Sequence, residues 1–323
     1  AQASYKTWWF RTTFPRPAGT AGERLVFDGV CNRCTVWLNG RRLGEHEGMF
    51  GGPEFEVGAL LRETNTLTVK LDGIPKDSSF WSGSNASWQK TVVFNNVYGW
   101  HYSQCPSLGI WRTVKVEGAP TVRIRDPFVA TRDVAKGIVD LVVALEGAGG
   151  RWSGKLAGTI APENFTGQER AFTLPVKSAG APKRLHLRFR IPDPRPWWPT
   201  DMGEPSLYRM TLSFVPADGG VADTHRFTFG IRTIAMAPLP GGPRPDKFNW
   251  TFVINGKPMF VKGTGWCTLD PLMDFSRPRY ERFLTLARDQ HCQMIRAWGS
   301  GMPETDDFYD LCDRLGIMVV QEW

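Results

Sequence analysis

The stretch FVINGKPMFVKGTGWCTLDPLMDFSRPRYERFLTLARDQHCQMIRAWGSGMPETDDFYDLCDRLGIMVVQEW, residues 252–323, decides how the chain folds. Here a pattern of strand, helix, strand, helix, strand replaces the short alternating strands that fill the rest of the chain. Asn255-Gly256 is a type I′ hairpin signal between two short strands, and a glycine-rich loop over residues 263–266 follows. This order predicts the opening of a series of β/α units.

The spacing of apolar side chains in this stretch predicts two helices. In the first, apolar residues recur at i, i+3, i+4 and i+7, after Ser276 as a cap and Pro278 in the first turn. The second helix repeats the stripe and ends at Gly316, where a C-terminal glycine cap belongs. The two stripes consist of Tyr280, Phe283, Leu284 and Ala287 in the first helix, and of Phe308, Leu311, Cys312 and Leu315 in the second.

Two apolar strands accompany these helices, at residues 294–298 and 317–321, and the second is apolar enough to be buried on both faces. In parallel sheets of this kind, functional side chains lie on the loops after the C-terminal ends of the strands. The sequence therefore predicts a binding site at this edge. Its candidate residues are Trp266 and Asp270 after the first strand, Arg296 and Trp298 at the end of the second, and Glu322 after the third.

Each candidate residue has a binding role and a structural alternative. Arg296 presents a rigid fork of donors to hydroxyls or a carboxylate, and its alternative is an internal ion pair that braces other carboxylates. Trp266 and Trp298 each offer a flat apolar face to a sugar ring, and their alternative is packing in the wall of the fold. Asp270 can accept hydrogen bonds from hydroxyls. On the second helix Asp310 and Asp313 lie off the apolar stripe, so we expect both to be solvated.

The rest of the chain is predicted to be antiparallel β-structure in two parts. Residues 1–118 contain alternating strands and a second hairpin signal, Asn39-Gly40. Residues 119–236 contain about seven short strands without a cysteine, which fits an immunoglobulin-like sandwich without the antibody disulfide. Residues 237–250 are rich in proline and glycine and are expected to link this sandwich to residues 251–323.

Composition excludes several classes of protein. The net charge is +7, but the arginines are dispersed, so we expect no nucleic-acid partner. No apolar run of 18 residues exists, so we expect no membrane span. Cys31 and Cys34 form a C-x-x-C, which we reject as a metal or redox motif because no second pair of cysteines or histidines follows it. No metal and no organic cofactor is expected.

A series of short motifs then appears in a fixed order along nearly the whole chain. They are residues 9–14 (WFRTTF), 36–40 (VWLNG), 109–112 (GIWR), 229–232 (FGIR), 252–258 (FVINGKP), 296–299 (RAWG) and 308–316 (FYDLCDRLG). Each motif alone is weak, but together and in this order they resemble the family 2 glycoside hydrolases. The RAWG motif and the helix that leads to Gln321 and Glu322 favour the β-mannosidase-like branch.

The resemblance implies a jelly-roll sandwich, an immunoglobulin-like sandwich and a (β/α)8 TIM barrel. The barrel would carry two catalytic glutamates that cleave the glycosidic bond with retention, one as acid and base and the other as nucleophile. A barrel needs ~250 residues, so the chain would be an N-terminal fragment that ends inside it. Both glutamates are then expected after Trp323, with no catalytic residue in this chain. By motif position Glu322 matches a non-catalytic acid of the family.

One motif departs from the branch. Where β-mannosidases carry Gly-Trp-Asp-Trp-Gly, with an aspartate that reaches the terminal mannose, residues 99–103 read GWHYS. His101 therefore takes the place of the carboxylate. A neutral imidazole offers one donor and one acceptor, whereas a carboxylate only accepts. We keep His101 as a candidate substrate-binding residue, with an ordinary surface-loop histidine as the alternative.

The resemblance leaves three functional hypotheses. The first is a retaining exo-β-glycosidase acting on β-mannosides, whose partner is a β-linked oligosaccharide or glycoside. The second is an exo-β-glucosaminidase or β-galactosidase-like member of the same family. The third, from another class, is a non-catalytic carbohydrate-binding protein. The oligomeric state stays open, and for the compartment a periplasmic or secreted location is favoured over the cytoplasm.

Overall fold

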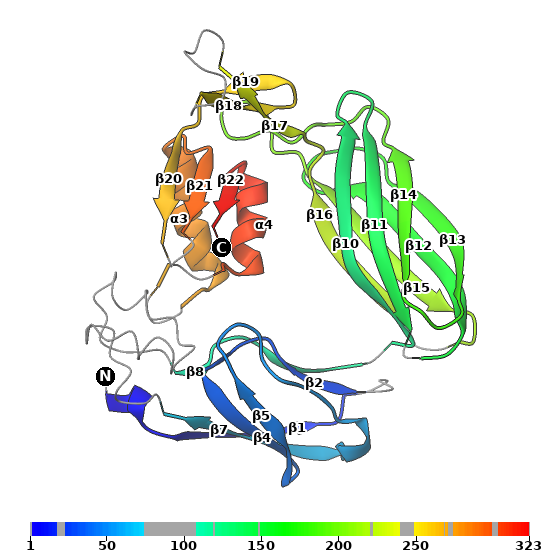
Figure 1. The fold of residues 1–323 in the computed structure, drawn as a ribbon, viewed down its shortest axis with the longest axis vertical. Helices are drawn as coiled ribbons and strands as arrows, with labels where there is room; N and C mark the ends of the chain where they lie inside the picture. Colours follow the sequence, from blue (N-terminus) through cyan, green and yellow to red (C-terminus); the bar gives the residue numbers. More distant parts are fainter. Residues whose placement is uncertain are drawn as a thin grey trace.

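A computed structural model describes residues 2–17, 23–73, 108–118, 120–147, 149–219, 222–239, 249–267, 269–270, 274–298 and 303–322. Most of these residues form antiparallel sheets, in blue and green in Figure 1. Both α-helices of the described residues belong to the orange and red segment near the C-terminal end. None of the described helices is long and apolar enough to cross a membrane.

The N-terminal part is a sandwich of short antiparallel strands. One sheet has the order β1-β7-β4-β5 and faces a second sheet with the order β6-β2-β9, while β3 pairs with β8. Asn39 and Gly40 have positive φ angles of 52° and 83° between β4 and β5, which confirms the predicted hairpin. The bounds are β1 (Trp8–Pro15), β2 (Arg24–Phe27), β3 (Val30–Cys31), β4 (Arg33–Leu38), β5 (Arg41–Glu47), β6 (Glu54–Glu56), β7 (Thr64–Asp72), β8 (Gly109–Ile110) and β9 (Val114–Glu117), with the 3-10 turns Gln2–Tyr5 and Gly58–Leu60.

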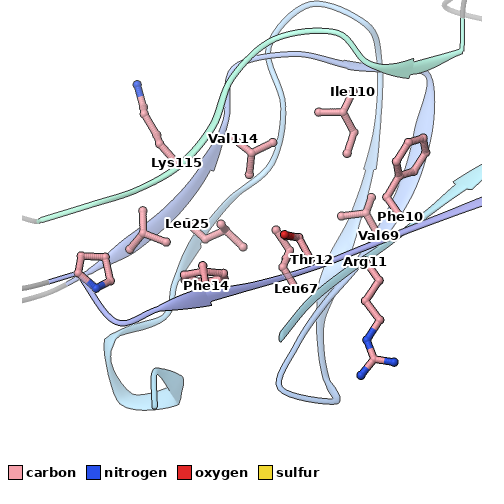
Figure 2. A pocket seen from close by; sticks show the side chains of 12 residues that line it. Phe10, Arg11, Thr12, Phe14, Leu25, Leu67, Val69, Ile110, Val114 and Lys115 are labelled. Atoms are coloured by element: carbon pink, nitrogen blue, oxygen red, sulfur yellow. The ribbon is translucent and has the colours of Figure 1, made fainter. Parts of the chain in front are cut away.

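An apolar cavity of about 480 Å³ opens between the two sheets of this sandwich. Figure 2 shows Phe14, Leu67 and Val114 directed into it from three different strands, whereas the side chain of Arg11 points away from it. Cys31 and Cys34 lie nearby in the core, both fully buried and both free thiols. Burial raises the pKa of Cys31 to about 12, so this thiol stays protonated and inert.

The central part is a two-sheet sandwich of seven strands, as predicted. One sheet has the order β10-β11-β14 and the other β13-β12-β15-β16, and all pairings are antiparallel. The alternating residues that predict strands β11 and β15 are buried on one face, which makes them the core between the sheets. The bounds are β10 (Val122–Asp133), β11 (Ile138–Gly147), β12 (Trp152–Pro162), β13 (Arg170–Ser178), β14 (Lys183–Arg190), β15 (Tyr208–Pro216) and β16 (Asp223–Phe229).

A small antiparallel sheet follows, formed by β17 (Ile234–Pro238), β18 (Trp250–Ile254) and β19 (Lys257–Met259). Asn255 and Gly256 have φ angles of 49° and 80° between β18 and β19, which confirms the predicted turn. The segment predicted as a linker, residues 237–250, begins and ends inside paired strands, because β17 and β18 hydrogen-bond to each other. Residues 240–248 between them lie outside the described residues.

The C-terminal segment is a parallel sheet with helices between its strands. The strands β20 (Gly263–Trp266), β21 (Met294–Ala297) and β22 (Met318–Gln321) alternate with helices α3 (Arg277–Asp289) and α4 (Asp306–Leu315). Residues 263–266 were expected to be a loop, and this was wrong. Gly263 lets β21 approach closely, because a Cβ at this position would lie 2.6 Å from the carbonyl oxygen of Met294.

The predicted helices are confirmed, with two corrections to their surroundings. Tyr280, Leu284 and three residues of the α4 stripe are buried, and Leu315 is half-buried. Phe283 is 42% exposed, so it does not share the buried face. Val320 is 40% exposed, so β22 is not buried on both faces in the described structure; it is the edge strand of its sheet. Gly316 caps α4 with a left-handed φ of 72°, as predicted.

The central sandwich is joined to the C-terminal segment through Trp197, which is 1% exposed. Its Nε1 donates to the carbonyl oxygen of Asp313 at 2.7 Å, and the guanidinium of Arg232 lies 4.5 Å from its ring centroid. Burial raises the pKa of Asp313 to about 6, which corrects the expectation that this carboxyl is solvated. Asp310 on the same helix is also not free in solvent, because it pairs with Arg277 at 2.6 Å and Arg314 at 3.0 Å.

Candidate functional site

The candidate site lies where the three parallel strands end. Trp266, Ala297 and Gln321 pair across the sheet in register, so the residues that follow them share one edge. Two further backbone hydrogen bonds extend this ladder: the amide of Trp298 donates to Trp266 at 3.1 Å, and that of Glu322 donates to Ala297 at 3.1 Å. The arrangement follows from the parallel strand order, which brings the C-terminal ends of all three strands together.

Arg296 and Glu322 form an ion pair at this edge. The Nε of Arg296 donates to Oε1 of Glu322 at 2.7 Å, and the two side chains are 58% and 36% exposed. The structure therefore brings these two candidate residues together from neighbouring strands, β21 and β22. The exposed guanidinium of Arg296 can donate to sugar hydroxyls, and the carboxylate of Glu322 beside it can accept from others.

Glu322 is oriented by a chain of hydrogen bonds from helix α4. Tyr309 Oη donates to Oε1 of Gln321 at 2.7 Å, and Nε2 of Gln321 donates to the backbone carbonyl of Glu322 at 2.7 Å. Both donors are partly buried, so the partly buried side chains of Tyr309 and Gln321 fix the backbone at the end of β22. This fixes the position from which Glu322 reaches Arg296.

We expect Arg296→Ala to change the free energy of unfolding by less than about 1 kcal/mol. Exposed ion pairs contribute little to stability because water and salt screen them, and this pair is exposed on both sides. Urea unfolding of the variant and of Arg184→Ala, an exposed strand arginine outside the site, measures the difference. A loss of several kcal/mol for Arg296→Ala alone would show that this arginine is a structural brace rather than a binding residue.

Trp266 faces the helices rather than the open edge of the sheet. Its ring centroid lies 5.2 Å from that of Phe308 and 6.5 Å from that of Tyr280, in the core of the C-terminal segment. Its Nε1 donates to Oε1 of Glu304 at 3.0 Å. These contacts correspond to the packing alternative for Trp266, in which the indole positions the end of β20.

Asp270, another candidate residue, is engaged by helix α3. It is 8% exposed, and its Oδ2 lies 2.7 Å from Nη2 of Arg279. Burying a carboxylate costs free energy unless an opposite charge pairs with it, and Arg279 provides that charge for Asp270. Asp270 therefore fixes the loop after β20 onto α3, while His101 lies outside the described residues.

Glu304 is a residue of this region that the sequence analysis missed. It is 7% exposed, between β21 and α4, and its two carboxylate oxygens accept from Nε1 of Trp266 and from Oη of Tyr280. Burial raises the pKa of Glu304 to about 7, although both hydrogen bonds act in the opposite direction. The sequence shows only an acid before a helix start, which is common at exposed helix ends, so nothing there marks it as buried.

The comparisons with known proteins agree with the fold. Residues 1–112 match a family model described as glycosyl hydrolase 2 galactose-binding domain-like, and residues 122–232 match one described as glycosyl hydrolases family 2. Beta-mannosidase B of Aspergillus terreus is 31% identical over 98% of this chain, and beta-mannosidase B of Aspergillus clavatus is 29% identical over the same share. The chain spans 39% of the length of each relative.

Solved structures give the same picture. The crystal structure of a β-D-mannosidase from Dictyoglomus thermophilum is 27% identical and superposes on 99% of this chain with a TM-score of 0.81. The chain covers 41% of that protein. An exo-chitosanase from Amycolatopsis orientalis shares the fold, with a TM-score of 0.73 at 20% identity.

Proposed function

Because residues 1–112 and 122–232 carry the domains of glycosyl hydrolase family 2, this chain belongs to that family, and we propose that it acts as part of an exo-β-glycosidase. The substrate we propose is a terminal β-mannoside. The observation that carries this proposal is the similarity to proteins named beta-mannosidase, which extends over 98% of the chain and through the candidate site. The activity would be that of the whole protein, to which this chain contributes binding surfaces.

We further propose that the segment β20-α3-β21-α4-β22 is the first part of a (β/α)8 barrel. The parallel order, with a helix between each pair of strands, supports this. The proposed domains are a jelly-roll domain over residues 1–118, an immunoglobulin-like sandwich over 119–236, a connection over 237–250 and the barrel segment from 251 to 323. The shared edge at Arg296, Trp298 and Glu322 would then lie at the barrel mouth.

In this proposal the two catalytic glutamates lie outside residues 1–323. One would protonate the leaving oxygen and the other would attack the anomeric carbon, with the two carboxyl groups ~5–5.5 Å apart. The described acids near the site have other partners: Glu322 pairs with Arg296, and Glu304 is buried between Trp266 and Tyr280. We propose that they position the substrate and the barrel wall.

The test compares the natural protein that carries this chain with residues 1–323 alone. With 4-nitrophenyl β-D-mannoside, we expect nitrophenol release from the natural protein and none above buffer from residues 1–323. The matching β-glucosaminide and β-galactoside separate the proposed sugar from its alternatives within the family. Turnover by residues 1–323 would place the catalytic acids within this chain. If the natural protein hydrolyses none of the three substrates, the result would favour a carbohydrate-binding protein without activity.

A further inference from the structure

A polar cleft of about 700 Å³ lies between the N-terminal sandwich and the C-terminal segment. On its sandwich wall Asp28 follows β2 and the other residues follow β8, and the residues of its other wall follow β20 and β21. Figure 1 shows the arrowhead of β20 directed toward the N-terminal sheets, so the C-terminal ends of the parallel strands face the N-terminal sandwich. None of the residues that line the cleft belongs to the site described above.

The sandwich wall of the cleft is held in place by packing and hydrogen bonds. Nε1 of Trp111 donates to the carbonyl oxygen of Met49 at 2.9 Å, and the backbone amides of Trp111 and Arg112 both approach the carbonyl of Gly29, at 3.2 and 3.3 Å. A Cβ on Gly29 would lie 2.8 Å from the Trp111 ring and 2.9 Å from the Arg112 side chain. Trp111 and Arg112 are therefore positioned before any ligand arrives.

Arg112 provides hydrogen-bond donors that the described structure leaves unused. Its guanidinium lies 5.1 Å from the centroid of the Trp111 ring, and no described carboxylate pairs with it. Lys115 on the same wall reaches Asp28 only at 3.4 Å. An arginine that is half-buried without an anionic partner retains its capacity to donate to a ligand oxygen.

The opposite wall provides acceptors. Phe275 meets Trp111 edge to face, with ring centroids 5.9 Å apart, so the two walls are in contact at this pair of rings. Asp307 is fixed by Arg277 at 2.7 Å, while Asp306, exposed in the first turn of α4, forms no ion pair with a described residue. An unpaired donor, Arg112, thus stands on one wall and an unpaired acceptor, Asp306, on the other. This arrangement suits hydroxyl groups, because each hydroxyl both donates and accepts.

The charge of the cleft restricts the class of ligand. Its lining contains the carboxylates of Asp28, Asp274, Asp306 and Asp307. Three of them have a cation beside them, because Lys115 lies 3.4 Å from Asp28, Arg279 lies 3.4 Å from Asp274 and Arg277 lies 2.7 Å from Asp307. Among the described residues, Arg112 and Asp306 remain as one positive and one negative charge without an ion pair. A lining with balanced charge gives no net attraction to an anionic uronate or to a cationic amino sugar. A neutral hexose needs no net charge in the lining and presents hydroxyls that both walls can bind.

We propose that this cleft binds a neutral hexose unit of a β-linked oligosaccharide, on the leaving-group side of the bond that is cleaved. The proposal rests on the proposed glycosidase function, because the chemistry of the substrate comes from it. Phe275 lies between β20 and α3, and Asp306 follows β21, so the loops that carry the candidate site also carry this wall. The cleft would favour oligosaccharides over simple aryl glycosides.

The test measures kcat/KM of the natural protein for β-1,4-mannotriose and for 4-nitrophenyl β-D-mannoside. For Arg112→Ala we expect the ratio of the two values, trisaccharide to aryl glycoside, to fall about tenfold, the effect of losing a hydrogen bond from a charged group. Asp306→Asn keeps the shape of the exposed helix end and should lower the same ratio, which covers the case in which Arg112→Ala fails to fold. Lys155→Ala, in a separate hollow of the central sandwich, is the matched control and should leave the ratio unchanged.

Three outcomes would overturn the inference. The first is an unchanged ratio in both cleft variants, and the second is an equal loss in the control. The third is a loss confined to a β-linked glucosamine trisaccharide, assayed as an additional substrate beside mannotriose, which would assign the cleft to an amino sugar. If the unmodified protein hydrolyses neither mannotriose nor the aryl mannoside, the proposed function fails, and that result is distinct from failure of the cleft.

Discussion

Trp197→Ala is expected to lower the free energy of unfolding by about 3–5 kcal/mol, the range for removing a fully buried aromatic side chain. The indole is 1% exposed and packs with Leu207, Ile254 and Met318, residues from three different parts of the chain. The substitution also removes the hydrogen bond to Asp313 at 2.7 Å and the ring beneath the Arg232 guanidinium. The central sandwich and the C-terminal segment would then lose a buried side chain that packs against both.

The measurement is urea unfolding of the natural protein and its variants, followed by far-ultraviolet circular dichroism. Trp250→Ala is the matched control, because Trp250 is 45% exposed and its loss creates no buried cavity. We expect the control to change the free energy of unfolding by less than about 1 kcal/mol. Equal effects of the two substitutions would show that the junction at Trp197 does not hold the two parts together.

The sequence predicted the elements whose signals are local. Asn39-Gly40 and Asn255-Gly256 form the expected hairpins, because the two residues with positive φ decide the turn. The helix stripe of α4 and its cap at Gly316 are also confirmed, since both depend on residues within one or two turns. The alternation along β11 and β15 gave the correct core of the central sandwich.

The errors lie where distant segments decide the structure. Residues 263–266 form a strand only because β21 lies alongside, and glycines alone predict a loop. Phe283 fits the stripe of α3, but no described segment covers it, so it remains exposed. Asp313 is buried by the central sandwich, which lies far away in the sequence. In each case the missing information is a contact between parts of the chain rather than a propensity.

In the candidate site, too, the sequence predicted some positions and not others. Arg296 and Glu322 meet as the parallel order of the strands requires, because each stands at the end of its strand. Trp266 stands at the same edge but turns its ring toward Phe308 and Tyr280. A strand end alone does not decide between these two orientations. What decides it is the buried acceptor Glu304, which satisfies the indole N–H inside the helix layer.

Glu304→Gln is expected to change how stability depends on pH, with the largest effect between pH 4.5 and 7. Burial raises the pKa of Glu304 from its ordinary 4.5 to about 7 in the folded protein. The folded state therefore holds the proton more tightly than the unfolded state. Its stabilisation is full below pH 4.5 and is lost as the pH rises to 7, a change of about 3 kcal/mol.

Glutamine cannot ionise, so Glu304→Gln removes this pH-dependent contribution. The substitution also changes the hydrogen bonds to Trp266 and Tyr280, but that cost is the same at every pH. The difference in free energy of unfolding, variant minus native, should shift by about 3 kcal/mol in favour of the variant between pH 4.5 and 8. Glu169→Gln, an exposed carboxylate, is the control and should show no such shift. Asp313, whose raised pKa acts in the same direction, leaves a residual slope in both proteins and cancels in the difference. A constant difference across this range would mean that Glu304 is ionised throughout, so that the hydrogen bonds from Trp266 and Tyr280 outweigh burial in setting its charge.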